Sequence, residues 1–138
     1  MSGLQLFAIS IFWIIAALGL VMVVMLLFKP GAVYPNFKLI TGLDFEALIK
    51  AKTVQEPAVN KLLNWTASIL LGSNGMTFFL AVSAFRDQHW LAWCALWYWP
   101  LMFLWHFAIY PRKTFFWYLQ LVWILLSVFA LLKNLPAS

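Results

Sequence analysis

Three polar side chains within one apolar run have the most scope for chemistry. Ser73, Asn74 and Thr77 lie close together in a stretch that carries no charged residue. A buried amide without a partner is costly in apolar surroundings, so Asn74 is expected to face another helix, a water-filled cavity or a polar ligand. Two interpretations stay open: a ligand or substrate site, or hydrogen bonds that join two helices where small residues allow close approach.

An imidazole in a second apolar run is the next candidate. His106 is expected about one turn inside the end of that run, on the same helical face as Trp99 and Phe103. Such an imidazole can act as an acid or base, ligate haem or contact a lipid headgroup. The alternative is an aromatic anchor at the membrane surface. A lipid-modifying or redox-cofactor enzyme would place its site between Asn74 and His106.

Tryptophans precede that histidine at helical spacing. Trp93 and Trp97 continue a stripe that begins at Trp90. The stripe could stack on a flat apolar ligand such as a quinone, sterol, carotenoid or chlorin, or it could pack against lipid and other helices. The sequence does not identify a cofactor. Pro100 is expected to kink this helix and to free a carbonyl near Leu96.

Charged candidates lie between the apolar runs. Arg86, Asp87 and His89 offer a cation, a carboxylate and an imidazole in one tight turn, and Arg112 and Lys113 form a second basic pair. These residues could bind a lipid headgroup or a partner protein, or they could be solvated turns. The two histidines are about 25 Å apart along a helix, and no cluster has metal-ligand spacing, so no metal site is predicted.

Four apolar segments must position these residues. The chain is 65% hydrophobic and 9% charged, unlike a soluble domain. The segments cover about residues 4–28, 62–85, 90–109 and 114–132, and each is long enough to cross about 30 Å of hydrocarbon. The first is expected to be retained as a span, because residues 1–3 lack the basic side chain of a signal peptide. The predicted fold is an all-α membrane protein, an antiparallel bundle of four transmembrane helices in a single domain, residues 1–138.

A polar loop, residues 29–61, separates the first two spans. Leu43, Phe45, Leu48 and Ile49 recur at near-helical spacing among charges, which predicts a short amphipathic helix in the membrane interface, or a solvated loop helix. Seven Lys and Arg residues lie in this loop and in 110–114, against two on the other side. The positive-inside rule then puts both loops in the cytoplasm and both termini opposite, in a plasma or inner membrane.

The function remains open among three classes. Basic residues flank apolar spans, so the net charge of +5 favours anionic lipid rather than nucleic acid as a partner. No Asp, Glu, Lys or Arg lies inside a span. The leading hypothesis is a non-enzymatic accessory or scaffold subunit that binds other membrane subunits. The alternatives are the small membrane enzyme described above and an oligomeric channel or transporter.

Overall fold

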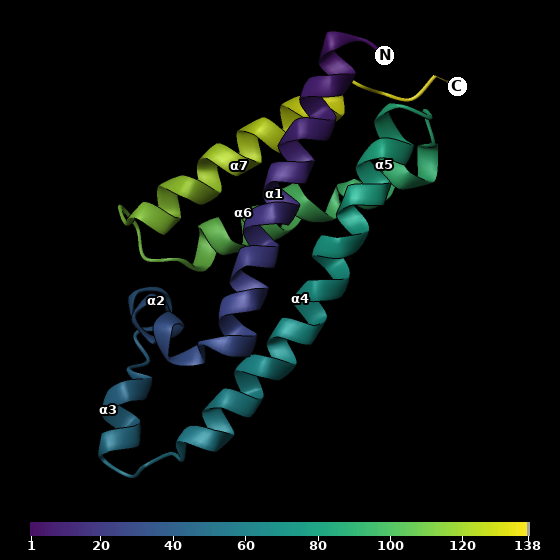
Figure 1. Cartoon of the computed structure of the whole chain (residues 1–138). Coiled ribbons are helices and arrows are strands. Elements are labelled where there is room, and N and C mark those ends of the chain that lie inside the picture. The colour runs from purple at the N-terminus through teal and green to yellow at the C-terminus, as the bar shows by residue number, and fades with distance from the viewer. Residues whose placement is uncertain (138) are drawn as a thin grey trace. The chain divides into compact units, whose positions relative to one another are not determined.

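The computed structural model describes residues 1–137, and every regular element in that range is a helix (Figure 1). In chain order the elements are α1 (Gly3–Phe28), the 3-10 turn η1 (Pro30–Val33), α2 (Tyr34–Thr41), α3 (Phe45–Lys50), α4 (Glu56–Phe85), α5 (Trp90–Leu96), α6 (Tyr98–Ile109) and α7 (Phe115–Leu132). The all-helical prediction is therefore confirmed for the described residues.

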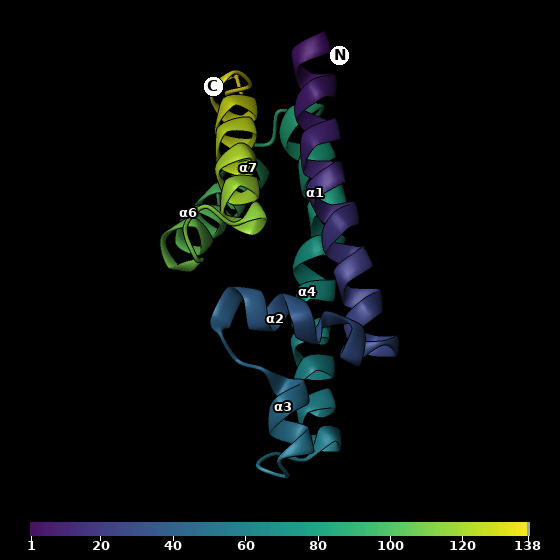
Figure 2. The same ribbon diagram turned by 90° about the vertical axis from the view of Figure 1, so that its left-hand side faces the viewer.

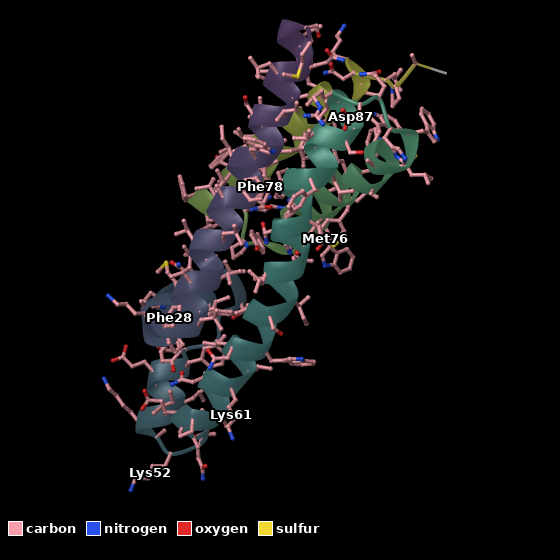
Figure 3. All side chains as sticks on the ribbon, turned by 45° about the vertical axis from the view of Figure 1, so that its right-hand side comes forward. Phe28, Lys52, Lys61, Met76, Phe78 and Asp87 are labelled. Atoms are coloured by element: carbon pink, nitrogen blue, oxygen red, sulfur yellow. The ribbon has the colours of Figure 1, made fainter. Side chains whose placement is uncertain are left out.

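Within residues 1–137, four stretches of helix are long and apolar enough to cross a membrane, as the sequence predicts. They are α1, α4, the pair α5 and α6 taken together as Trp90–Ile109, and α7. The helix α4 begins six residues before the predicted span, at Glu56. An acidic residue and a proline suit the first turn of a helix, so Glu56 and Pro57 extend it at little cost. In the second half of α4 the Met76 side chain projects outward, and Asp87 follows just after the helix ends (Figure 3).

The contacts divide the chain into two compact units. The first unit comprises residues 1–17 and 74–137, and therefore contains the start of α1, the end of α4, and α5 to α7. Its core includes side chains from each of these helices: Phe12, Phe85, Leu96, Phe103 and Leu131. The close packing of these side chains adds dispersion contacts between the helices, which hold them together. The predicted single domain and antiparallel bundle stay predictions.

The second unit comprises residues 18–73, with a core of its own that includes Val23, Leu63 and Ala67. The short helices α2 and α3 belong to this unit and lie beside the first half of α4 (Figure 2). The Tyr34 hydroxyl donates a hydrogen bond to Asn60 Oδ1 over 2.7 Å. This bond ties the start of α2 to α4.

The predicted short helix in the polar loop is present as α3, and Asp44 caps it. The Asp44 carboxylate accepts a hydrogen bond from the Ala47 backbone N–H at 3.0 Å and pairs with Lys38 Nζ at 2.8 Å. The helix α2, which carries Lys38, was not predicted. In the sequence, Pro35 and Gly42 look like residues of a loop. In the structure Pro35 lies in the first turn of α2, where proline is tolerated, and Gly42 ends the helix with φ of 76°.

The third predicted span is interrupted at Trp97, between α5 and α6. The Trp97 N–H bonds to the Cys94 carbonyl at 3.2 Å, a tighter turn than in an α-helix. Proline has no N–H, so Pro100 cannot donate to the carbonyl of Leu96 four residues earlier. The break therefore lies one residue after the carbonyl to which Pro100 cannot donate, as a proline kink would place it.

Candidate functional site

Two of the polar candidates are deeply buried on one face of α4. Thr77 is 1% exposed and Asn74 is 2% exposed. The indole Nε1 of Trp99, on α6, donates a hydrogen bond to Thr77 Oγ1 over 2.8 Å. Ser73 is only partly buried, and its hydroxyl donates to the Leu70 carbonyl of its own helix at 3.2 Å. The structure thus joins Thr77 to a partner on another helix.

The Thr77–Trp99 contact is the kind of bond that the helix-contact interpretation expects, because it joins two helices inside an apolar core. No sequence signal paired these residues, since they are 22 positions apart and apolar residues surround both. The sequence placed Trp99 on the helical face of His106, but it did not predict the contact with Thr77. A ligand role for Asn74 stays a prediction.

His106 lies on α6 in a half-buried position. Its ring stacks on Tyr110, with centroids 5.1 Å apart and planes at 11°. Trp99 and His106 are seven residues apart on one helix, which is about 10 Å of rise. The His106–Tyr110 stack is thus two turns away from the Thr77–Trp99 bond. A shared site between Asn74 and His106 stays a prediction.

The tryptophan stripe exists as a set of ring contacts. Trp90 stacks on Trp93 with centroids 5.1 Å apart, and Trp93 meets Trp97 edge-on at 5.8 Å. Trp93 is 8% exposed, and its indole Nε1 donates to the Leu131 carbonyl at 3.0 Å. The indole N–H of Trp93 therefore bonds to α7. This is the arrangement expected if the stripe packs between helices.

The turn after α4 holds its charges in a fixed arrangement. Arg86 Nε and Nη2 donate to the two carboxylate oxygens of Asp87 at 2.7 and 3.1 Å. The Arg86 guanidinium, above all through these hydrogen bonds, holds the pKa of Asp87 below its ordinary value. His89 caps α5, because its Nδ1 accepts from the Ala92 N–H at 3.4 Å. The turn thus offers a cation and a carboxylate side by side.

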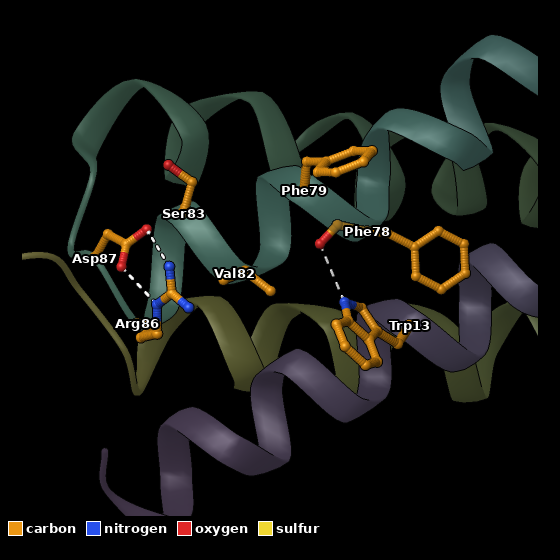
Figure 4. Close-up of a pocket in the computed structure, with 7 residues that line it drawn as sticks. All are labelled: Trp13, Phe78, Phe79, Val82, Ser83, Arg86 and Asp87. Atoms are coloured by element: carbon orange, nitrogen blue, oxygen red, sulfur yellow. Dashed lines mark hydrogen bonds and ion pairs between the residues drawn. The ribbon is translucent and has the colours of Figure 1, made fainter.

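A groove of about 360 Å³ opens between α1 and the end of α4 (Figure 4). It lies within the first unit. Its lining changes from aromatic to charged, in the order Trp13, Phe78, Phe79, Val82, Ser83, Arg86 and Asp87. Trp13 Nε1 donates to the Phe78 carbonyl at 3.1 Å, and the two rings lie 5.8 Å apart. The sequence did not predict this groove, because Trp13 and Phe78 are 65 positions apart.

The remaining candidates and one missed residue lie around the α6–α7 connection. Arg112 and Lys113 are exposed there. Gln120 on α7 is 7% exposed, and its Oε1 accepts no hydrogen bond from the described part of the chain. The sequence could have identified Gln120, because its amide lies in an otherwise apolar run and the same reasoning identified Asn74.

No protein-family model, curated protein or solved structure matches this chain. Among residues 1–137, no group of three His, Cys, Asp or Glu side chains could hold a metal ion.

Proposed function

We propose that the chain is an integral membrane protein whose four long helices cross the bilayer as an antiparallel bundle. The observation that carries the proposal is the outward apolar surface of these helices. In the 18-residue apolar stretch of each candidate span, only 22 to 33% of the residues are buried inside the chain, and Ile69, Met76 and Leu125 are 60, 62 and 62% exposed. Monomeric soluble proteins rarely expose so much contiguous apolar surface, whereas lipid solvates it.

The orientation follows from the basic residues. Loops 29–61 and 110–114 face the cytoplasm of a plasma or inner membrane, and both termini lie on the opposite side. Lys52, Lys61 and Lys113 are exposed in or beside these loops, where they can contact anionic lipid headgroups.

Within this membrane, the chain acts as a non-enzymatic accessory subunit. Polar groups of the first unit hold helices together: Trp99 Nε1 donates to Thr77, Trp93 Nε1 to the Leu131 carbonyl, and Asn134 Nδ2 to the Leu4 carbonyl at 3.3 Å. Large exposed aromatic side chains flank the α6–α7 connection, namely Trp105, Phe115 and Tyr118. Aromatic residues are enriched at protein interfaces. The partner surface is therefore this aromatic end of α6 and α7.

Photo-crosslinking in native membranes tests the accessory role. A photoreactive residue replaces Trp105 or Phe115 in separate variants, with exposed Thr53 as the matched control position. The expected result is one and the same membrane protein crosslinked from both aromatic positions, and not from position 53. That protein must also co-purify at a fixed ratio in mild detergent. Adducts with lipid alone, or with a second copy of this chain alone, would contradict the proposal.

A second candidate is a small lipid-modifying or redox-cofactor-binding enzyme. The buried Gln120 Oε1 favours it, because none of the described groups satisfies this carbonyl and a donor on a bound molecule would do so. Purified protein would then show a visible absorbance band from the cofactor, or release a bound lipid product. Intact cellular function in Gln120→Leu, Asn74→Ala and His106→Ala variants would count against an enzyme.

A further inference from the structure

The groove between α1 and α4 has the layout of a site for an amphiphile. Its aromatic end and its charged end are separated along α4, because Phe78 and Arg86 are eight residues apart, about 12 Å of helix. The residues between them include Val82 and Ser83, which face the same groove (Figure 4). A ligand lying along α4 would therefore place an apolar part against the rings and a polar part at Arg86 and Asp87.

The size and rigidity of the groove limit what it can take. A volume of about 360 Å³ is near the lower end for small-molecule sites, which hold roughly 300–1,000 Å³. Trp13 and Phe78 form a wall that is fixed by a hydrogen bond and a ring contact. Such a groove can hold a headgroup and part of one acyl chain, whereas a macrocyclic cofactor would not be enclosed.

The charges select the headgroup. Arg86 uses two of its five N–H donors on Asp87, so the others can donate to a phosphate. The Asp87 carboxylate has lone pairs left for an ammonium group. Both side chains are open to ligand, with exposures of 59 and 48%. A neutral pair of fixed charges is complementary to a zwitterion.

We propose that this groove binds one phospholipid whose headgroup carries a phosphate and a primary ammonium, as in phosphatidylethanolamine. The phosphate accepts from Arg86, the ammonium donates to Asp87, and one acyl chain lies against Trp13 and Phe78. A choline headgroup has no N–H to donate, and a glycerol headgroup has no cation. The inference rests on the proposed membrane insertion, because α4 ends at Phe85 and so places Arg86 at headgroup depth.

Native mass spectrometry of the full chain tests the lipid preference. The protein is released from nanodiscs that contain equal amounts of phosphatidylethanolamine, phosphatidylcholine and phosphatidylglycerol with identical acyl chains. The expected result is a one-to-one adduct with phosphatidylethanolamine, favoured by about tenfold, the scale of one charge-assisted hydrogen bond. Equal adducts with all three lipids would overturn the inference.

Substitutions locate the binding. Arg86→Gln and Asp87→Asn are each expected to abolish the preference, whereas Arg112→Gln, an exposed cation outside the groove, keeps it. Val82→Trp fills the apolar section and removes the adduct, with exposed Leu71→Trp as its matched control. A preference that survives both Arg86→Gln and Val82→Trp would place the lipid elsewhere and refute the site.

A membrane wash separates this inference from the proposed function. Membranes that hold the same chain are treated with alkaline carbonate, which removes peripheral proteins. Retention of the chain without a lipid preference would refute the groove assignment alone. Release of the chain by the wash would refute the membrane insertion on which both proposals depend.

Discussion

Indole N–H groups supply many of the polar contacts between the apolar helices. Trp13 donates to the Phe78 carbonyl, Trp93 to the Leu131 carbonyl and Trp99 to Thr77. An indole carries a single donor on a large apolar body. One hydrogen bond therefore satisfies the whole side chain, and tryptophan can join helices in hydrocarbon without leaving a polar atom unpaired.

Replacing Thr77 with Val is expected to destabilise the fold by about 1–3 kcal/mol, because it leaves the buried Trp99 indole N–H without its acceptor. The free energy of unfolding in mixed detergent micelles measures the effect. Thr66→Val is the matched control, since the Thr66 hydroxyl bonds to the Leu62 carbonyl of its own helix at 2.9 Å; its effect should stay within about 0.5 kcal/mol. An equal loss from both variants would contradict the role of the bond.

At the residue scale, the sequence indicated that Asn74 and Thr77 would be buried, but it did not predict their partners. Asn74 and Thr77 were singled out because polar side chains inside an apolar run need a compensating contact, and both are buried. Their partners depend on how distant helices pack. The spacing of residues along the sequence therefore could not predict that Trp99 bonds to Thr77 or that Trp13 forms a wall of the groove.

At the scale of elements, the helix ends are set by local chemistry. Asp44 caps α3 and pairs with Lys38 on α2, so one carboxylate orders two short helices. The hydrogen bond from Lys38, and then that from the Ala47 N–H, hold the pKa of Asp44 below its ordinary value of 3.8. The ionised carboxylate therefore stabilises this segment.

The α2–α3 segment is expected to loosen in acid. Because the folded-state pKa of Asp44 is lowered, its stabilising effect is complete above pH 3.8 and is lost as the pH falls through the lower folded value. Amide and carboxyl chemical shifts of Ala47 and Asp44 in an NMR titration measure this change. Asp44→Asn retains a capping oxygen but should show no such titration, whereas Asp44→Ala should fray α3 at every pH. A titration of the Ala47 amide that persists in Asp44→Asn would contradict the assignment.

The long helices were predictable because length and hydrophobicity alone define them. The bounds of α1, α7 and the Trp90–Ile109 span lie within a residue of the predicted ones at each end. The helix α2 was missed, because its Pro35 and the following Gly42 serve as first-turn and end residues of a helix but resemble a loop. Short helices depend on capping and packing, and the periodicity of apolar residues does not predict either of these.

At the scale of the whole molecule, an even number of crossings must leave both termini on one side. In a Cys94→Ser background, Ser2→Cys is expected to react with a membrane-impermeant maleimide in intact cells. Thr53→Cys and Lys113→Cys should react only after the cells are permeabilised. Accessibility of residues 53 and 113 from opposite sides would refute the four-span topology.

The contacts between α1 and α7 also decide how the chain would respond to a pulling force. The Asn134 side chain donates to the Leu4 carbonyl, and the rings of Phe129 and Phe7 have centroids 6.0 Å apart. At these contacts α1 and α7 therefore run in opposite directions, with both chain ends at the same end of the pair. A force that pulls the two termini apart would act first on the Asn134–Leu4 contact. Once this contact breaks, the force would act on the next contact along the two helices. These helices would unzip from one end rather than slide past each other, and their mechanical resistance would be that of single contacts broken in turn.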